Sequence, residues 1–153
     1  MQLIPLGKVR QGAKSSLILF SALCFSPLLV GQTFSIGGPA TAKQKTSPTF
    51  TISMSGSSGK NVATIQWTVQ LPAGVYLAQS SAACNPSTGI CMAGLSNKAL
   101  TDGTIATVRL TFSKSTSIGK NWISLGNMFA ADVNGYDCDV PLTGPGMNVK
   151  VSK

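Results

Sequence analysis

Few side chains in this sequence could carry out acid–base or metal chemistry. The chain holds no His and no Glu, and its acidic residues are Asp102, Asp132, Asp137 and Asp139. Without His it has neither the usual general base nor the commonest metal ligand. A glycosidase needs two carboxyl groups that flank the sugar bond, and three of the four Asp lie in one turn-forming segment. We therefore predict that the chain is not an enzyme.

The segment from Asp132 to Val140, DVNGYDCDV, concentrates the oxygen ligands that Ca²⁺ prefers. The candidate ligands are Asp132, Asn134, Asp137 and Asp139. An EF-hand loop needs Asp or Asn at its fifth position and Gly at its sixth, where this chain has Tyr136 and Asp137. Asp and Asn are also habitual turn formers. The alternatives are thus a calcium site and a simple turn, and no other cofactor is expected.

Exposed aromatic rings are the side chains with which a flat protein face would bind sugar, because a ring buries much apolar area at a low entropy cost. Alternation of apolar and polar residues places the rings of Trp67, Phe50 and Phe112 on inward faces. The remaining candidates are Trp122, Tyr76 and Tyr136. Trp122 is out of phase with Ile123, so it is either a core residue of the opposite register or part of a ligand platform.

Short strands must position these candidates. Phe50 to Met54, Ala63 to Val69 and Ala106 to Phe112 alternate apolar and polar residues with period two. Turns rich in Gly, Ser and Pro separate the strands, Asn134-Gly135 is a hairpin signal, and no stretch shows helical periodicity. Eight or nine short strands in about 120 residues indicate an all-β fold, an antiparallel β-sandwich with jelly-roll topology.

The first 31 residues differ from the rest. Met1 to Ser16 carries three basic residues and no acid, and Leu17 to Val30 is almost wholly apolar. This layout is typical of a signal peptide, and the apolar run is shorter than the ~20 residues that span a bilayer. We predict a signal peptide over 1–31 and one secreted or cell-surface domain over 32–153, with no permanent membrane span after cleavage. A membrane anchor and a lipoprotein modified at Cys24 are the alternatives.

The predicted mature chain is basic, but its charge is spread along the sequence. Without the three basic residues of the first segment, nine of the 12 Lys and Arg remain against four Asp, a net charge of +5. Nucleic-acid-binding proteins concentrate such charge on one face or segment. We therefore expect no nucleic-acid partner.

The mature chain keeps three cysteines. In an oxidising compartment, Cys84 and Cys91 in CNPSTGIC are expected to form a disulfide, because Asn85, Pro86 and Gly89 supply the turn between them. Cys138 is then the odd cysteine, and we expect it to be mostly buried.

Three segments carry a family resemblance. They are ATIQWTVQLPAGV (Ala63 to Val75), DGTIATVRLTF (Asp102 to Phe112) and ISLGNMFAADVNG (Ile123 to Gly135). In this order they resemble the cohesin-like modules of bacterial secreted proteins, whose superfamily also holds family 2 and 3 carbohydrate-binding modules. The resemblance covers about Thr33 to Val151. Its motifs are mostly core and turn positions, so they specify the fold better than the ligand.

The resemblance implies a nine-stranded jelly roll that acts as a non-catalytic binding or structural module outside the cytoplasm. It implies a protein partner, with an extracellular polysaccharide as the alternative. Three aromatic side chains in line on one sheet face would favour a sugar, whereas a flat, polar, Thr-rich face would favour a protein.

The predicted export has a direct test. The secreted protein should begin at or within a few residues of Gln32, because the basic and apolar segments precede this residue and the strand pattern follows it. Mass spectrometry of the secreted protein measures the new terminus. An intact Met1 terminus in the membrane fraction would show that the segment is an anchor.

Overall fold

The computed structural model describes residues 32–56, 62–94, 98–138 and 143–153. The predicted signal peptide over 1–31, with Cys24, and the candidate ligand Asp139 lie outside these residues. Every regular element in the described ranges is a strand. These ranges contain no helix that is long and apolar enough to cross a membrane.

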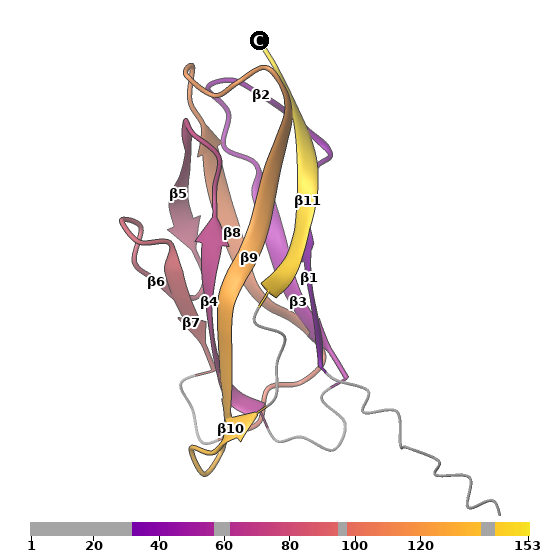
Figure 1. The fold of residues 1–153 in the computed structure, drawn as a ribbon, viewed down its shortest axis with the longest axis vertical. Coiled ribbons are helices and arrows are strands. Elements are labelled where there is room, and N and C mark those ends of the chain that lie inside the picture. The colour runs from indigo at the N-terminus through magenta and orange to yellow at the C-terminus, as the bar shows by residue number, and fades with distance from the viewer. Residues whose placement is uncertain (1–31, 57–61, 95–97, 139–142) are drawn as a thin grey trace, which may run out of the picture.

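Two β-sheets pack face to face in an elongated β-sandwich (Figure 1). A four-stranded sheet has the order β1-β3-β8-β5, with β1 (Thr33–Gly37), β3 (Thr49–Ser55), β8 (Gly103–Phe112) and β5 (Val75–Ser80). A seven-stranded sheet has the order β2-β11-β9-β4-β7-β6, and β10 pairs with β9. Its strands are β2 (Thr41–Lys43), β11 (Thr143–Ser152), β9 (Gly119–Asp132), β4 (Val62–Gln70), β7 (Ile90–Ala93), β6 (Ala83–Cys84) and β10 (Asp137–Cys138).

The predicted all-β sandwich is confirmed, but the strand count and one pairing direction differ from the prediction. The described residues form 11 strands rather than eight or nine, because β6 and β10 have two residues each and the first segment splits into β1 and β2. β1 pairs with β3, and the chain then crosses to the other sheet, where β2 runs parallel to β11. At this crossing a Cβ on Gly38 would collide with the Phe50 ring, so the passage needs glycine.

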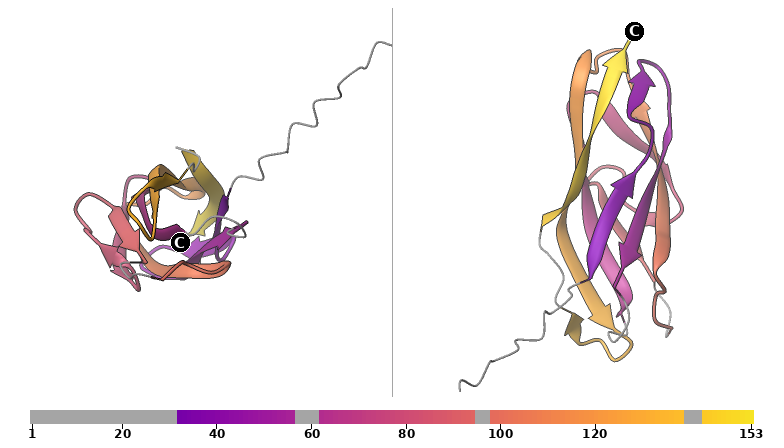
Figure 2. Two further views of the ribbon diagram at one scale, coloured as in Figure 1. Left: turned by 90° about the horizontal axis from the view of Figure 1, so that it is seen from below. Right: turned by 90° about the vertical axis from the view of Figure 1, so that its right-hand side faces the viewer.

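The core lies between the inner faces of the two sheets, whose strands are seen end-on at the left of Figure 2. Trp67 of β4 is fully buried, and so are Phe50 of β3 and Phe112 of β8, whose ring centroids lie 6.4 Å apart. The period-two pattern thus predicted the inward residues of β3, β4 and β8 correctly. These strands fix which side chains are left on the outer faces.

The two tryptophans should differ in their contribution to stability. Trp67→Ala removes a fully buried ring and should lower the free energy of unfolding by about 3–5 kcal/mol. Trp122→Ala removes an exposed ring and should cost clearly less. Denaturant unfolding of both variants measures the difference, and equal losses would contradict the burial seen here.

Candidate functional site

The three predicted ligand-binding aromatics are all exposed, but they do not form one platform. Trp122 is 55% exposed on β9 of the seven-stranded sheet. Tyr76 is 58% exposed on β5 of the four-stranded sheet, and Tyr136 is 72% exposed in the turn between β9 and β10. Because the residues lie on different parts of the molecule, no row of these aromatics exists on one sheet face.

Trp122 lies on the outer side of the sheet, over the neighbouring strand. A Cβ built on Gly146 of β11 would collide with the Trp122 ring, so the ring covers the backbone of the neighbouring strand. This resolves the two alternatives for Trp122: it packs on glycine at the outer surface and not in the core. In the same way, a Cβ on Gly126 would collide with the Gln70 side chain. The Oε1 atom of Gln70 accepts a hydrogen bond from Ser124 Oγ at 2.9 Å. The two glycines let large side chains lie against the strands.

Sequence analysis missed three further apolar side chains on this surface. Phe129 of β9 is 49% exposed, Ile90 of β7 is 41% exposed, and Met92 of β7 is partly exposed. They flank the polar outer side of β4, because Gln66 lies opposite both Met92 and Phe129, and Thr68 lies opposite Ile90.

A β-bulge explains why Phe129 was missed. Counting in twos from the buried Ile123 and Leu125 would place residue 129 inside. The register of β4 and β9 shifts between Gln66 and Thr68, and Asn127 has a φ of 48°. Beyond this bulge the buried residues are Met128 and Ala130, so Phe129 points outward. In the sequence, the signal of this bulge is that the apolar residues change from odd positions, Ile123 and Leu125, to even positions, Met128 and Ala130.

We refer to these outward side chains together as the β4/β7/β9 face. It comprises Gln66, Thr68, Gln70, Ile90, Met92, Trp122 and Phe129. None of them is charged, and at the Trp122 end Lys120 of β9 lies directly opposite Lys150 of β11. The face is thus apolar and amide-rich, with positive charge at one end.

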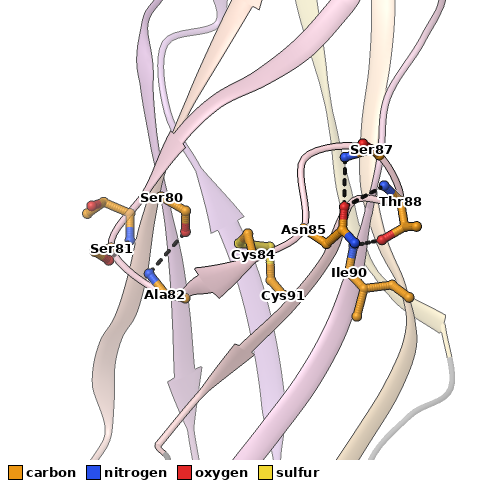
Figure 3. Close-up of a disulfide and its surroundings, with 10 residues drawn as sticks. Ser80, Ser81, Ala82, Cys84, Asn85, Ser87, Thr88, Ile90 and Cys91 are labelled. Atoms are coloured by element: carbon orange, nitrogen blue, oxygen red, sulfur yellow. Dashed lines mark hydrogen bonds between the residues drawn. A yellow bond between two sulfur atoms is a disulfide. The ribbon is translucent and has the colours of Figure 1, made fainter.

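A disulfide secures the edge of this face. Cys84 and Cys91 are joined, which confirms the predicted pair (Figure 3). Asn85 Oδ1 accepts hydrogen bonds from the backbone N–H groups of Ser87 and Thr88 at 2.9 and 3.4 Å, which shapes the intervening turn. Cys91 is fully buried opposite Trp67. The covalent link therefore fastens β6 to the strand that presents Ile90 and Met92.

The odd cysteine, Cys138, lies in β10 and is half-buried rather than mostly buried. Its Sγ lies 3.9 Å from the carbonyl oxygen of Tyr136, toward which it donates. β10 pairs with the end of β9 that is farthest from the C-terminus (Figure 1).

The candidate calcium segment forms a hydrogen-bonded turn around Asp132. The backbone N–H groups of Asn134 and Tyr136 donate to Asp132 Oδ1 at 2.8 and 2.9 Å. Chiefly the bond from Tyr136 holds the pKa of the Asp132 carboxyl below its ordinary value. In the described part of the chain, no three His, Cys, Asp or Glu residues are grouped to hold a metal. The geometry favours the turn, and calcium binding by Asp132, Asn134, Asp137 and Asp139 stays a prediction.

The role of Asp132 predicts a pH dependence of this turn. Since the folded-state pKa is lowered, the turn is stabilised above the ordinary Asp value of about 3.9 and is released as the pH falls through the lower folded value. The amide resonances of Asn134 and Tyr136 should titrate together below the ordinary value in NMR spectra. Asp132→Asn should abolish this titration, and a midpoint at or above the ordinary value would contradict the assignment.

Comparison with protein families finds no family that matches this sequence, and comparison with curated proteins finds no matching relative. Similar solved structures exist. A non-cellulosomal cohesin from the archaeon Archaeoglobus fulgidus aligns with a TM-score of 0.58 and 11% identity, over 79% of this chain and 92% of that one. A cohesin module from a Clostridium perfringens family 33 glycoside hydrolase aligns with a TM-score of 0.63 and 15% identity, over 80% and 98% of the two chains.

A third similar structure is a chain of the complex between a CaDoc0917 variant and CaCohA2 at pH 5.5. Its TM-score is 0.62 and its identity 13%, over 79% of this chain and 99% of that one. At such identities the likeness is one of fold. The two sheets therefore form a β-sandwich with the fold of cohesin modules.

Proposed function

We propose that this chain is a secreted, non-catalytic binding module that holds a protein partner on its β4/β7/β9 face. The observation that carries the proposal is the set of exposed apolar side chains, with Trp122 and Phe129 foremost, on a sheet face where Gly146 leaves room for the Trp122 ring. The fold likeness to cohesin modules, one of them from a complex of two proteins, supports it.

The composition of the face suits a protein better than a sugar. Protein interfaces have a core enriched in aromatic residues and Met and depleted in charge, within a polar surround. Trp122, Phe129 and Met92 lie beside the amide and hydroxyl groups of Gln66 and Thr68. The polysaccharide alternative has less support, because Trp122, Tyr76 and Tyr136 do not form a row of aromatic rings on one sheet face. The opposed Lys120 and Lys150 predict a partner that is acidic at that end.

The residue inventory supports a role without catalysis. The sequence contains no His or Glu, and Asp132 is engaged by the backbone of its own turn. The Asp102 carboxylate accepts a hydrogen bond from the Gly56 backbone N–H at 3.2 Å. Both carboxylates thus accept hydrogen bonds from backbone N–H groups of loops. The signal-like first segment and the Cys84–Cys91 disulfide support export to an oxidising compartment.

Site-specific photo-crosslinking tests the proposed face. The secreted protein, with benzoylphenylalanine at position 129, is mixed either with dockerin modules or with the extracellular proteins of the producing cell. On illumination it should crosslink to one partner. The same group in place of Tyr76, an exposed ring on the other sheet, is the matched control. Unlabelled protein should compete, and a Phe129→Asp variant should compete at least about tenfold more weakly, because a charge would enter an apolar contact.

Two results would contradict the proposal. Crosslinks of equal yield from positions 129 and 76 would mean that the β4/β7/β9 face is not selective. Retention of the protein on an insoluble polysaccharide, lost in Trp122→Ala, would favour the carbohydrate-binding alternative.

A further inference from the structure

A polar pocket of about 450 Å³ opens on the four-stranded sheet, on the side of the sandwich opposite the β4/β7/β9 face. Its walls come from the segment that leads into β3, from the middle of β8, and from the end of β5. Most of its lining is Ser, Thr, Gln and Arg, and no carboxylate lines it. The proposed protein contact makes no use of this pocket.

A β-bulge in β5 builds one wall. Val75 and Leu77 are buried, so strict alternation would also place Gln79 inside. The register with β8 shifts between Leu77 and Gln79, which leaves Gln79 opposite Arg109 on the outward side. Thr49 of β3 lies opposite Arg109 from the other direction. One row across three strands therefore presents a hydroxyl, a guanidinium and an amide.

Arg109 is held in place while most of its donors stay available. Its Nε donates to the carbonyl oxygen of Ser47 at 3.0 Å, and the Ser47 hydroxyl is hydrogen-bonded to that of Thr111 at 2.8 Å. A guanidinium has five N–H donors in a fixed plane, and its Nη groups can bind a carboxylate through two parallel hydrogen bonds. Within the described ranges, Arg109 makes no ion pair with an acidic side chain.

The hydroxyl groups beside Arg109 are also ordered. The Thr107 backbone N–H donates to Ser81 Oγ at 2.8 Å, and the Ser81 N–H donates to the Thr107 carbonyl oxygen at 2.9 Å. These bonds fix the end of β5 against β8. A hydroxyl that accepts such a bond still has a proton to donate, so Ser81 can contact a polar ligand.

We propose that this pocket binds an acidic sugar, with the uronate carboxylate on Arg109 and the sugar hydroxyls on the Ser, Thr and Gln side chains around it. The desolvated apolar pockets that recognise peptide side chains are absent from the lining, where Pro48 and Val108 are the apolar residues. A hydroxyl- and amide-rich wall instead matches a ligand that carries a hydroxyl on most carbons. The site is independent of the proposed protein contact, since it belongs to the other sheet.

NMR titration of the labelled secreted protein with digalacturonate tests the proposal. The amides of Thr107 and Ser81 and the Arg109 Nε–H should shift and saturate. Arg109→Gln should weaken binding at least about tenfold, because a hydrogen bond to a charged group is lost. Lys120→Gln is the matched control, since it removes the same charge from the other sheet and should leave binding unchanged. Arg109→Lys keeps the charge but not the paired donors, and it should bind with intermediate affinity.

Each of the following results would overturn the proposal. Digalacturonate could leave the three resonances of the wild-type protein unmoved. Lys120→Gln could weaken binding as much as Arg109→Gln, which would indicate general charge attraction. The neutral disaccharide galactobiose could bind as well as digalacturonate, which would show that the carboxylate has no role. The carboxylate of acetyl-diglycine could bind more tightly than digalacturonate, which would show that the sugar has no role.

A control checks that the variants fold. Thr107 and Ser81 amide resonances at their wild-type positions in the variants would show that the folds of the variants are intact.

Discussion

The packing of the two inner sheet faces against each other is the interaction on which the rest of this structure depends. Trp67, Phe50 and Phe112 fill the space between the sheets and are fully excluded from water. A side chain of a strand has only two directions available, inward or outward. Filling the core therefore also decides which residues reach the two outer faces, and every candidate binding group in the described chain is a residue that the core excludes.

The outer faces that result differ in chemistry. The seven-stranded sheet exposes Trp122, Phe129 and Ile90 beside uncharged polar groups, with lysines at one end. The four-stranded sheet exposes hydroxyl groups and Arg109. In each case a β-bulge supplies a key residue, because the shifts in β9 and β5 turn Phe129 and Gln79 outward. The bulges thus add functional groups to a sandwich whose core follows simple alternation.

The sequence could predict the features that depend on residues close together along the chain, and not those that depend on contacts between distant segments. Trp67 follows from period-two alternation, and the Cys84–Cys91 disulfide follows from turn residues between two nearby cysteines. The outward position of Phe129 depends on a register that β4 imposes across the sheet. The crossing at Gly38 and the parallel β2–β11 pair depend on contacts between distant segments. Single candidates such as Trp122 could therefore be identified from the sequence, whereas the exposure of Trp122 and the grouping of residues into faces required the structure.

Hydroxyl-radical footprinting, with and without the partner captured through position 129, measures the central claim most directly. In the free protein Trp122, Phe129 and Tyr76 should be oxidised, while the buried Trp67 should not. Partner binding should protect Trp122 and Phe129 and leave Tyr76 as reactive as before. Protection of Tyr76 with unchanged oxidation of Trp122 and Phe129 would show that the partner binds elsewhere and would contradict the assignment of the β4/β7/β9 face.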